Sequence, residues 1–186
     1  DNTYDKTAGY PAATVGALQN ALAAGGSVTV ANDMDPAATL TTTGKATLDA
    51  NGKTIANTTD IWEGMPIDWS LVSARGSGAN LTITGNGKFE AKANDCYAVD
   101  VQDGATVTIE NGTFNGNIHA VYVLEGTAYI KGGFFSVQQK YPDATKADGF
   151  VLNCYDANRA NGTATIVVTG GTFVNFNPAD CWAEGA

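Results

Sequence analysis

The chain has 186 residues, and its 10 Lys and Arg against 19 Asp and Glu give a net charge of −9. Nucleic-acid backbones and anionic membrane surfaces bind clusters of basic side chains, so this balance argues against both as partners. No apolar run approaches the roughly 18 residues that cross a bilayer, and the opening DNTYDKTAGY lacks a signal-peptide pattern, so we expect no membrane insertion.

The first predicted element is a helix over residues 14–24, with the sequence TVGALQNALAA. Thr14 suits the N-cap position, Leu18 and Leu22 fall on one face, and two glycines follow the last turn. A strand is expected directly afterwards, over Ser27–Val30. The opening of the chain therefore predicts a short amphipathic helix that runs straight into a strand.

A glycine followed two residues later by phenylalanine occurs repeatedly after this strand. The copies are Gly87/Phe89, Gly112/Phe114, Gly133/Phe135 and Gly171/Phe173, with a weaker copy at Gly52 and Ile55. Successive glycines are 35, 25, 21 and 38 residues apart, and the two long intervals contain visible insertions. Without the insertions the repeat measures roughly 20–25 residues, a period that indicates a solenoid.

Each repeat contains two strands in which apolar and polar residues alternate, as in half-buried strands. In a β-solenoid each strand pairs in parallel with its equivalent one coil away, about 4.8 Å distant. Equivalent residues should then form inward columns. These columns are Tyr97/His119/Phe150, Val72/Val99/Val121/Leu152, Ala74/Val101/Val123/Cys154, Leu81/Val107/Ala128/Ile166 and Ile83/Ile109/Ile130/Val168.

These patterns predict an all-β solenoid formed by one domain over residues 14–180, between an extension at 1–13 and a tail at 181–186. The repeated glycine is expected at a corner with positive φ, and the following Phe should fill that corner from inside. The helix over 14–24 should cap one end, where core and backbone would otherwise be exposed. No comparable cap is expected at the other end.

The helix, the GGSVTV strand and the Gly-x-Phe coils together resemble the right-handed parallel β-helix superfamily typified by pectin and pectate lyases. A closer likeness is to the Gly-Gly-Thr-Phe repeat proteins of gut bacteria and their phages, which occur in surface and virion appendages. The resemblance covers roughly residues 14–180. It implies a right-handed β-helix and says little about activity, because such folds include lyases, hydrolases and non-catalytic adhesion modules.

Candidate catalytic groups are acidic. Asp103, Glu125 and Asp156 each follow an upstream strand, so they would stack as a ladder with about 4.8 Å between rungs. That spacing would suit a glycosidase or a bound Ca²⁺, and Arg75 could supply the base of a lyase. The alternatives are solvated corner carboxylates and a surface ion pair between Arg75 and neighbouring acids.

The candidate binding residues are predicted on the outward side of the upstream strands. They are Arg75, Asp100, Tyr122, Asn153 and Tyr155. Tyrosine rings offer flat faces to the C–H surfaces of sugars, and amide, carboxylate and guanidinium groups can pair with hydroxyls. This strip therefore predicts contact with a polysaccharide or cell-surface glycan.

Four large apolar side chains are candidates for an interface. Trp62, Met65 and Trp69 lie in an insertion too apolar for ordinary solvent exposure, and Trp182 lies near the end of the chain. They should pack on the solenoid wall or on another copy of the chain in a trimer, with ligand contact as the alternative.

The sequence thus predicts a non-catalytic β-helix with a structural role on a cell or virion surface, as a fibre or adhesin-like module that contacts glycans. A small polysaccharide lyase or glycoside hydrolase is the alternative. No cofactor is expected for the first function, and Ca²⁺ is a possibility for the second.

Overall fold

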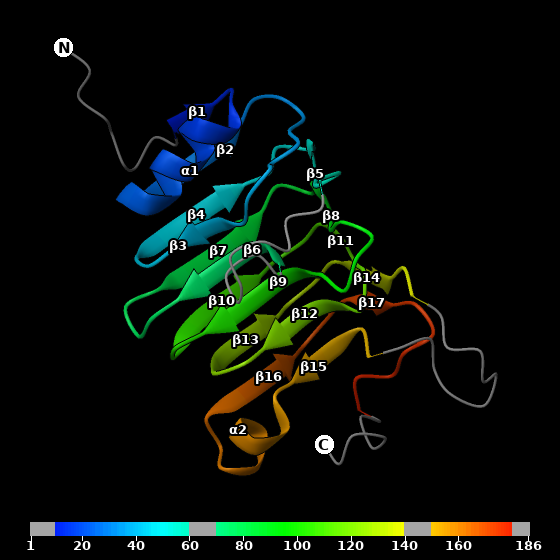
Figure 1. Ribbon diagram of the computed structural model, residues 1–186. Helices are drawn as coiled ribbons and strands as arrows, with labels where there is room; N and C mark the ends of the chain where they lie inside the picture. The colour runs from blue at the N-terminus through cyan, green and yellow to red at the C-terminus, as the bar shows by residue number, and fades with distance from the viewer. Residues whose placement is uncertain (1–9, 60–69, 140–149, 180–186) are drawn as a thin grey trace.

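The computed structural model describes residues 10–59, 70–139 and 150–179. Within these ranges the strands form three sheets, and every pairing between strands is parallel. From β2 onward, successive strands enter different sheets, so the sheets rise together as a stack from α1 at one end to α2 at the other (Figure 1). The protein is therefore all-β with stacked parallel sheets, an arrangement compatible with the predicted β-helix.

Sheet A has seven strands, and sheets B and C have five each. Sheet A contains, in order, β1 (Tyr10–Ala12), β2 (Gly26–Val30), β4 (Lys45–Asp49), β7 (Asn80–Thr84), β10 (Ala105–Ile109), β13 (Gly126–Ile130) and β16 (Ala164–Val168). Sheet B contains β5 (Thr54–Ala56), β8 (Lys88–Glu90), β11 (Thr113–Gly116), β14 (Phe134–Val137) and β17 (Thr172–Phe173). Sheet C contains β3 (Leu40–Thr42), β6 (Ser70–Arg75), β9 (Tyr97–Gln102), β12 (His119–Val123) and β15 (Leu152–Cys154).

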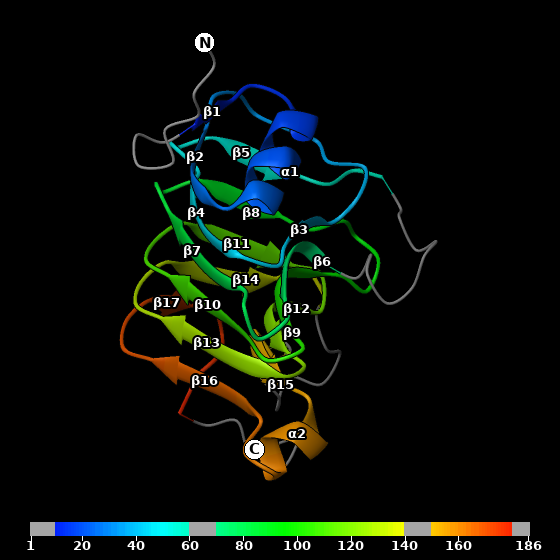
Figure 2. The ribbon, with the colours of Figure 1, turned by 90° about the vertical axis from the view of Figure 1, so that its left-hand side faces the viewer.

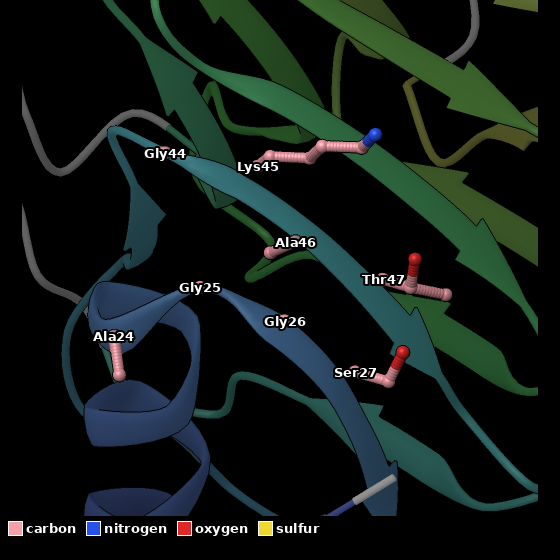
Figure 3. A pocket seen from close by; sticks show the side chains of 8 residues that line it. All are labelled: Ala24, Gly25, Gly26, Ser27, Gly44, Lys45, Ala46 and Thr47. Atoms are coloured by element: carbon pink, nitrogen blue, oxygen red, sulfur yellow. The ribbon is translucent and has the colours of Figure 1, made fainter. Parts of the chain in front are cut away.

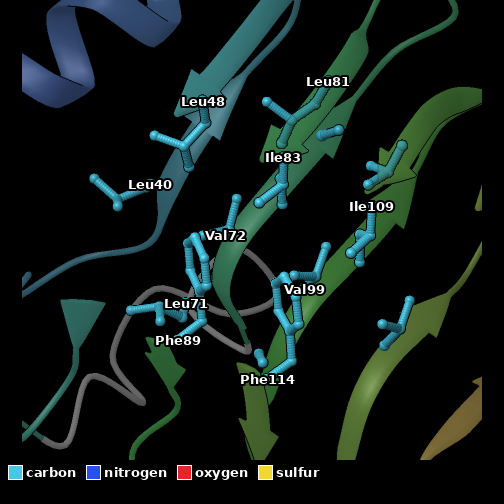
Figure 4. Packing of buried hydrophobic residues seen from close by; sticks show 14 of the residues in the cluster. Leu40, Leu48, Leu71, Val72, Leu81, Ile83, Phe89, Val99, Ile109 and Phe114 are labelled. Carbon is cyan, nitrogen blue, oxygen red and sulfur yellow. The ribbon is translucent and has the colours of Figure 1, made fainter. Parts of the chain in front are cut away.

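Four of the five predicted inward columns are confirmed by the strand register. In sheet A, Leu81 pairs with Val107 and Ile83 pairs with Ile109, and the same columns continue through β13 and β16. In sheet C, Val72 pairs with Val99 and Ala74 with Val101, and these columns continue through β12 and β15. Side chains from the three sheets meet in one hydrophobic core (Figure 4).

The phenylalanines of the repeated phrase form a continuous stack inside the corner. Neighbouring rings of Phe89, Phe114, Phe135 and Phe173 lie 4.8, 5.2 and 5.1 Å apart and almost parallel. Gly112 has φ 119°, and a Cβ there would lie 3.0 Å from the Phe114 ring. The glycine thus provides both the left-handed corner and the room for the ring behind it.

The helix α1 (Val15–Ala24) begins as predicted, because the Thr14 side chain accepts a hydrogen bond from the Ala17 N–H. Leu18 and Leu22 are fully buried, so the helix covers the core at this end of the stack. The Gln19 amide exchanges two hydrogen bonds with the Thr41 backbone, at 2.8 and 3.0 Å. Its side chain therefore covers the otherwise unpaired edge of β3. Sequence patterns place residues 10–12 in an extension, whereas they form β1 and pair with β2.

The strands of sheet C depart from strict alternation, which makes the predicted inward column of Tyr97 and His119 wrong. Two consecutive residues face the core in each strand: Leu71 and Val72, Ala98 and Val99, Ala120 and Val121, Val151 and Leu152. The parallel ladder skips the first residue of the pair in β6, β9 and β12, and the N–H groups of Ala120 and Val121 both donate to the Val151 carbonyl. A local irregularity of this kind moves the preceding residue to the outward face. Phe150 precedes β15 and contacts Phe176 edge-on.

Candidate functional site

Polar and aromatic side chains gather on the outward face of sheet C. The face carries Ser70, Ser73 and Arg75 from β6, Tyr97, Asp100 and Gln102 from β9, His119 and Tyr122 from β12, and Asn153 from β15. Ser73, Asp100, Tyr122 and Asn153 form one register column across the four strands. We call this set of nine residues the sheet C strip. It brings together four of the five predicted binding residues.

Asp100 is the centre of a polar network in this strip. Its Oδ2 accepts a hydrogen bond of 2.7 Å from the Gln102 amide, and the Ser73 hydroxyl lies beside the carboxyl. The Arg75 Nε donates to the Ser73 Oγ at 2.9 Å, so the guanidinium lies close to the acid. The network therefore links two planar polar groups, of Gln102 and Arg75, to a single carboxyl.

The carboxyl of Asp100 is almost completely buried, with 1 % of its surface exposed. Burial raises its pKa, and the Ser73 hydroxyl, the Gln102 amide and the Arg75 guanidinium act in the opposite direction. The Ser70 hydroxyl acts on the carboxyl in the same direction as the Ser73 hydroxyl. The sequence predicts Asp100 as an exposed binding residue, whereas the structure buries its carboxyl, which accepts a hydrogen bond from Gln102.

Three rings stack on this face. The Tyr97 ring lies 4.7 Å from that of Tyr122 and 5.4 Å from that of His119, and all three planes are nearly parallel. Burial raises the pKa of Tyr97 far above its usual range, so its phenol stays protonated. The three stacked rings form a rigid aromatic cluster next to the polar network.

The tautomer of His119 follows from its partners. Its Nδ1 lies 2.6 Å from the carbonyl oxygen of Phe150, which can only accept, so Nδ1 carries the proton. Its Nε2 faces the Asn153 amide nitrogen at 3.4 Å. Burial lowers the pKa of His119 to about 4, and the bond to Phe150 opposes that shift. The imidazole is therefore neutral at pH 7.

The accessible residues of this face lie on both sides of β9. Arg75, Tyr122 and Asn153 are half-buried, and Tyr155, which directly follows β15, is 47 % exposed. The buried part, with Tyr97, Asp100 and Gln102, lies on β9. A ligand that reaches the strip from solvent would therefore meet two tyrosines and an amide at β12 and β15, and the Arg75 guanidinium on the other side of β9.

The predicted acidic ladder does not make a cation site. Asp103 occupies a left-handed turn with φ 55°, whereas Asp156 begins the short helix α2 (Asp156–Ala160). All three carboxylates of the proposed ladder, Asp103, Glu125 and Asp156, are exposed. In the described ranges no group of three or more His, Cys, Asp or Glu side chains could hold a metal ion. The start of α2 takes the chain away from the ladder after Tyr155.

The four predicted interface residues, Trp62, Met65, Trp69 and Trp182, lie outside the described residues. Of the three cysteines, Cys96 is a buried free thiol, and Cys154 is a half-buried one. Burial raises the pKa of Cys96 to about 12. A thiol that stays protonated at pH 7 is a poor nucleophile, so Cys96 has a packing role.

A hollow of about 460 Å³ lies where α1 runs into β2, lined by residues 24–27 and 44–47 (Figure 3). Its walls are mostly backbone and small side chains. Ser27 and Thr47 are register partners on β2 and β4, whereas the Lys45 side chain points away from them (Figure 3). The hollow therefore offers no arrangement comparable to the strip.

Sequence reasoning missed Tyr97 and His119 as outward residues and the burial of Asp100. The signal for the first two was present in the strands themselves, because each contains two adjacent apolar residues, as in AVDV and AVYV. Strict alternation across that pair puts Tyr97 and His119 on the wrong side of the strand. The burial of Asp100 has no local sequence signal.

No known protein family, curated protein or solved structure matches the chain. Neither α1 nor α2 has the length and apolar character needed to cross a membrane.

Proposed function

We propose that this protein is a right-handed parallel β-helix of the pectin lyase-like kind that binds glycans without converting them. The stacked parallel sheets, the capping helix and the Gly-x-Phe corners support the finer fold assignment. Its location would be extracellular, on a cell or virion surface, as a fibre or adhesin-like module. A homotrimer would be consistent with such an appendage.

The observation that carries the binding function is the accessible edge of the sheet C strip. Tyr122 and Tyr155 offer ring faces there, and Asn153, the register partner of Tyr122, offers a planar amide. The Arg75 guanidinium lies on β6, on the other side of β9. Sugars combine apolar C–H faces with hydroxyl pairs, so rings next to planar polar groups suit them. The buried carboxyl of Asp100 would hold Gln102 and Arg75 in place.

The burial and the positions of the acidic side chains support binding without catalysis. Asp100 is buried beneath the face and unable to approach a ligand, and Asp103, Glu125 and Asp156 do not gather around a common point that could hold a cation. His119 is neutral, and both of its nitrogens face partners. These residues favour a binding surface over the lyase or glycosidase alternative.

A glycan array with the wild type and single variants tests this proposal. Tyr155→Ala and Tyr122→Ala should each weaken binding by about tenfold, because each removes one ring face. Phe134→Ala is the matched control, since Phe134 is 43 % exposed but lies on sheet B. Binding that survives in both tyrosine variants would refute the proposal. So would release of new sugar ends from pectin or alginate that Asp103→Asn or Glu125→Gln abolishes.

A further inference from the structure

A directed chain of hydrogen bonds joins β12 and β15, the two strands of sheet C nearest α2 (Figure 2). The His119 Nδ1–H donates to the Phe150 carbonyl at 2.6 Å, so the His119 Nε2 keeps a lone pair and can only accept. The Asn153 amide nitrogen faces this Nε2 at 3.4 Å, and the Asn153 Oδ1 accepts from the Cys154 N–H at 2.9 Å. Every member of the chain therefore donates in the same direction, from the Cys154 N–H to the Phe150 carbonyl.

This chain fixes the orientation of the Asn153 amide. An amide donates from its nitrogen and accepts at its oxygen, and a half-turn about its last side-chain bond exchanges the two with little change in shape. In the observed orientation both ends face a matching group. The reversed amide would set its NH₂ against the Cys154 N–H and its oxygen against the Nε2 lone pair of His119. Neutral His119 therefore selects one of the two orientations.

A proton on Nε2 reverses that selection. An imidazolium donates from both nitrogens, so its Nε2–H would face the Asn153 NH₂, which is also a donor. A half-turn of the amide gives the Nε2–H an acceptor, and it takes the acceptor away from the Cys154 N–H. The bond from Nδ1 to the Phe150 carbonyl is the same in both states. The amide, and not the ring, is thus the group that must rearrange.

The surroundings of the imidazole hold the ring in place. The rings of Tyr97 and Tyr122 stack on it, with centroids 5.4 and 5.5 Å away. These two phenols and the carboxyl of Asp100, the register partner of Tyr122, are the titratable groups of β9 and β12 on this face among the described residues. Phenols are neutral in acid, whereas burial raises the pKa of Asp100. A test must therefore separate the titration of His119 from that of Asp100.

We propose that His119 is a positioning residue of the sheet C strip, and that its protonation reverses the Asn153 amide. Asn153 is half-buried and is the register partner of Tyr122, so the reversal exchanges a donor for an acceptor beside that ring. The consequence for a ligand rests on the function proposed above. A glycan that pairs with the amide at pH 7 meets the opposite pattern in acid and binds more weakly.

The test is NMR of the glycan-free protein during an acid titration. His119 is the only histidine of the chain, so its ring nitrogens are identified without ambiguity. At pH 7 the proton should lie on Nδ1, with Nε2 unprotonated. As His119 takes up its second proton, the signals of the Asn153 side-chain amide and of the Cys154 N–H should shift with the same midpoint. His119→Gln should abolish these shifts, and Asp100→Asn should retain them.

Asn153→Asp is the matched variant, because a carboxylate of the same shape accepts on both sides. It should raise the pKa of His119 from about 4 by about 1–3, since the imidazolium gains an opposite charge. The Cys154 N–H should then keep its acceptor and shift far less as His119 titrates. This variant also moves the titration toward neutral pH, where acid unfolding does not interfere.

The inference is wrong if Nε2 carries the proton at pH 7, or if Asn153→Asp leaves the pKa of His119 unchanged. It is also wrong if the Cys154 signal does not follow His119, or ceases to follow it in Asp100→Asn. These measurements contain no glycan, so they separate a failure of the switch from a failure of the proposed function, which the glycan array decides. Glycan binding by the wild type that is equal at about pH 4 and about pH 7 would refute the effect on the ligand.

Discussion

Asp100 and His119 are two titratable groups on the outward face of sheet C whose pKa values are shifted by burial. Burial raises the pKa of Asp100 and lowers that of His119, because it disfavours the charged form of each. The stability that Asp100 contributes is present at low pH and is lost as pH rises through its folded-state pKa. The pKa of His119 is lowered, so the stability that depends on its neutral form is present at high pH and is lost as pH falls.

The unfolding free energy should fall as pH drops from 6.5, the ordinary pKa of histidine, to about 4, the pKa of folded His119. Over that interval His119 binds a proton in the unfolded chain but not in the folded one. This difference lowers the unfolding free energy by about 1–3 kcal/mol. Urea unfolding of the wild type and of His119→Gln at about pH 7 and about pH 4.5 isolates this contribution. The many carboxylates titrate in both proteins, so equal losses of stability would rule out the assignment.

At the scale of single elements, α1 stabilises the stack by two different means. Its apolar face buries Leu18 and Leu22 on the core, and Gln19 pairs with the backbone of the edge strand β3. The apolar face could be predicted from the spacing of leucines in the sequence. The bond to Thr41 could not, because it joins residues 22 apart that meet only once the helix lies over sheet C.

Gln19→Ala should therefore lower the unfolding free energy by about 1–3 kcal/mol, since it leaves an N–H and a carbonyl of β3 without partners. Asn20→Ala is the matched control, because Asn20 is the neighbouring amide on α1 and is exposed. Urea unfolding of the three proteins measures the difference. A loss of the same size in both variants would mean that helix propensity, and not the edge contact, is responsible.

Other elements also combine features that a local sequence pattern predicts with features that depend on residues far away in the sequence. The Gly-x-Phe phrase predicts both the corners and the Phe stack, because each copy contains its own glycine and its own ring. Gly87 is an exception: its coil has left-handed residues at Gly85 and Asn86, and a Cβ on Gly87 would lie 2.2 Å from the Ala50 Cβ. That close approach involves the preceding coil, so no local pattern indicates it.

At the scale of the whole molecule, the two ends of the stack differ. One end is closed by α1, whereas β15, β16 and β17 are the last strands of their sheets among the described residues. Ile166 and Val168 on β16 are half-buried, although Ala128 and Ile130, their partners on β13, are fully buried. Between these ends the strand register places Tyr122 and Asn153 of the proposed binding face beside each other. Both proposals therefore depend on parallel coils stacked in that register.

Disulfide trapping measures this register directly. In a variant with Cys96, Cys154 and Cys181 replaced by serine, Thr82→Cys with Thr108→Cys should cross-link readily under mild oxidation. The two residues are direct partners on β7 and β10, and their Cα atoms should be about 4.8 Å apart, within disulfide range. Thr82→Cys with Thr106→Cys should stay reduced, because that diagonal spans about 8 Å. Equal cross-linking of the two pairs, or faster cross-linking of the diagonal pair, would show that the coils do not stack in this register.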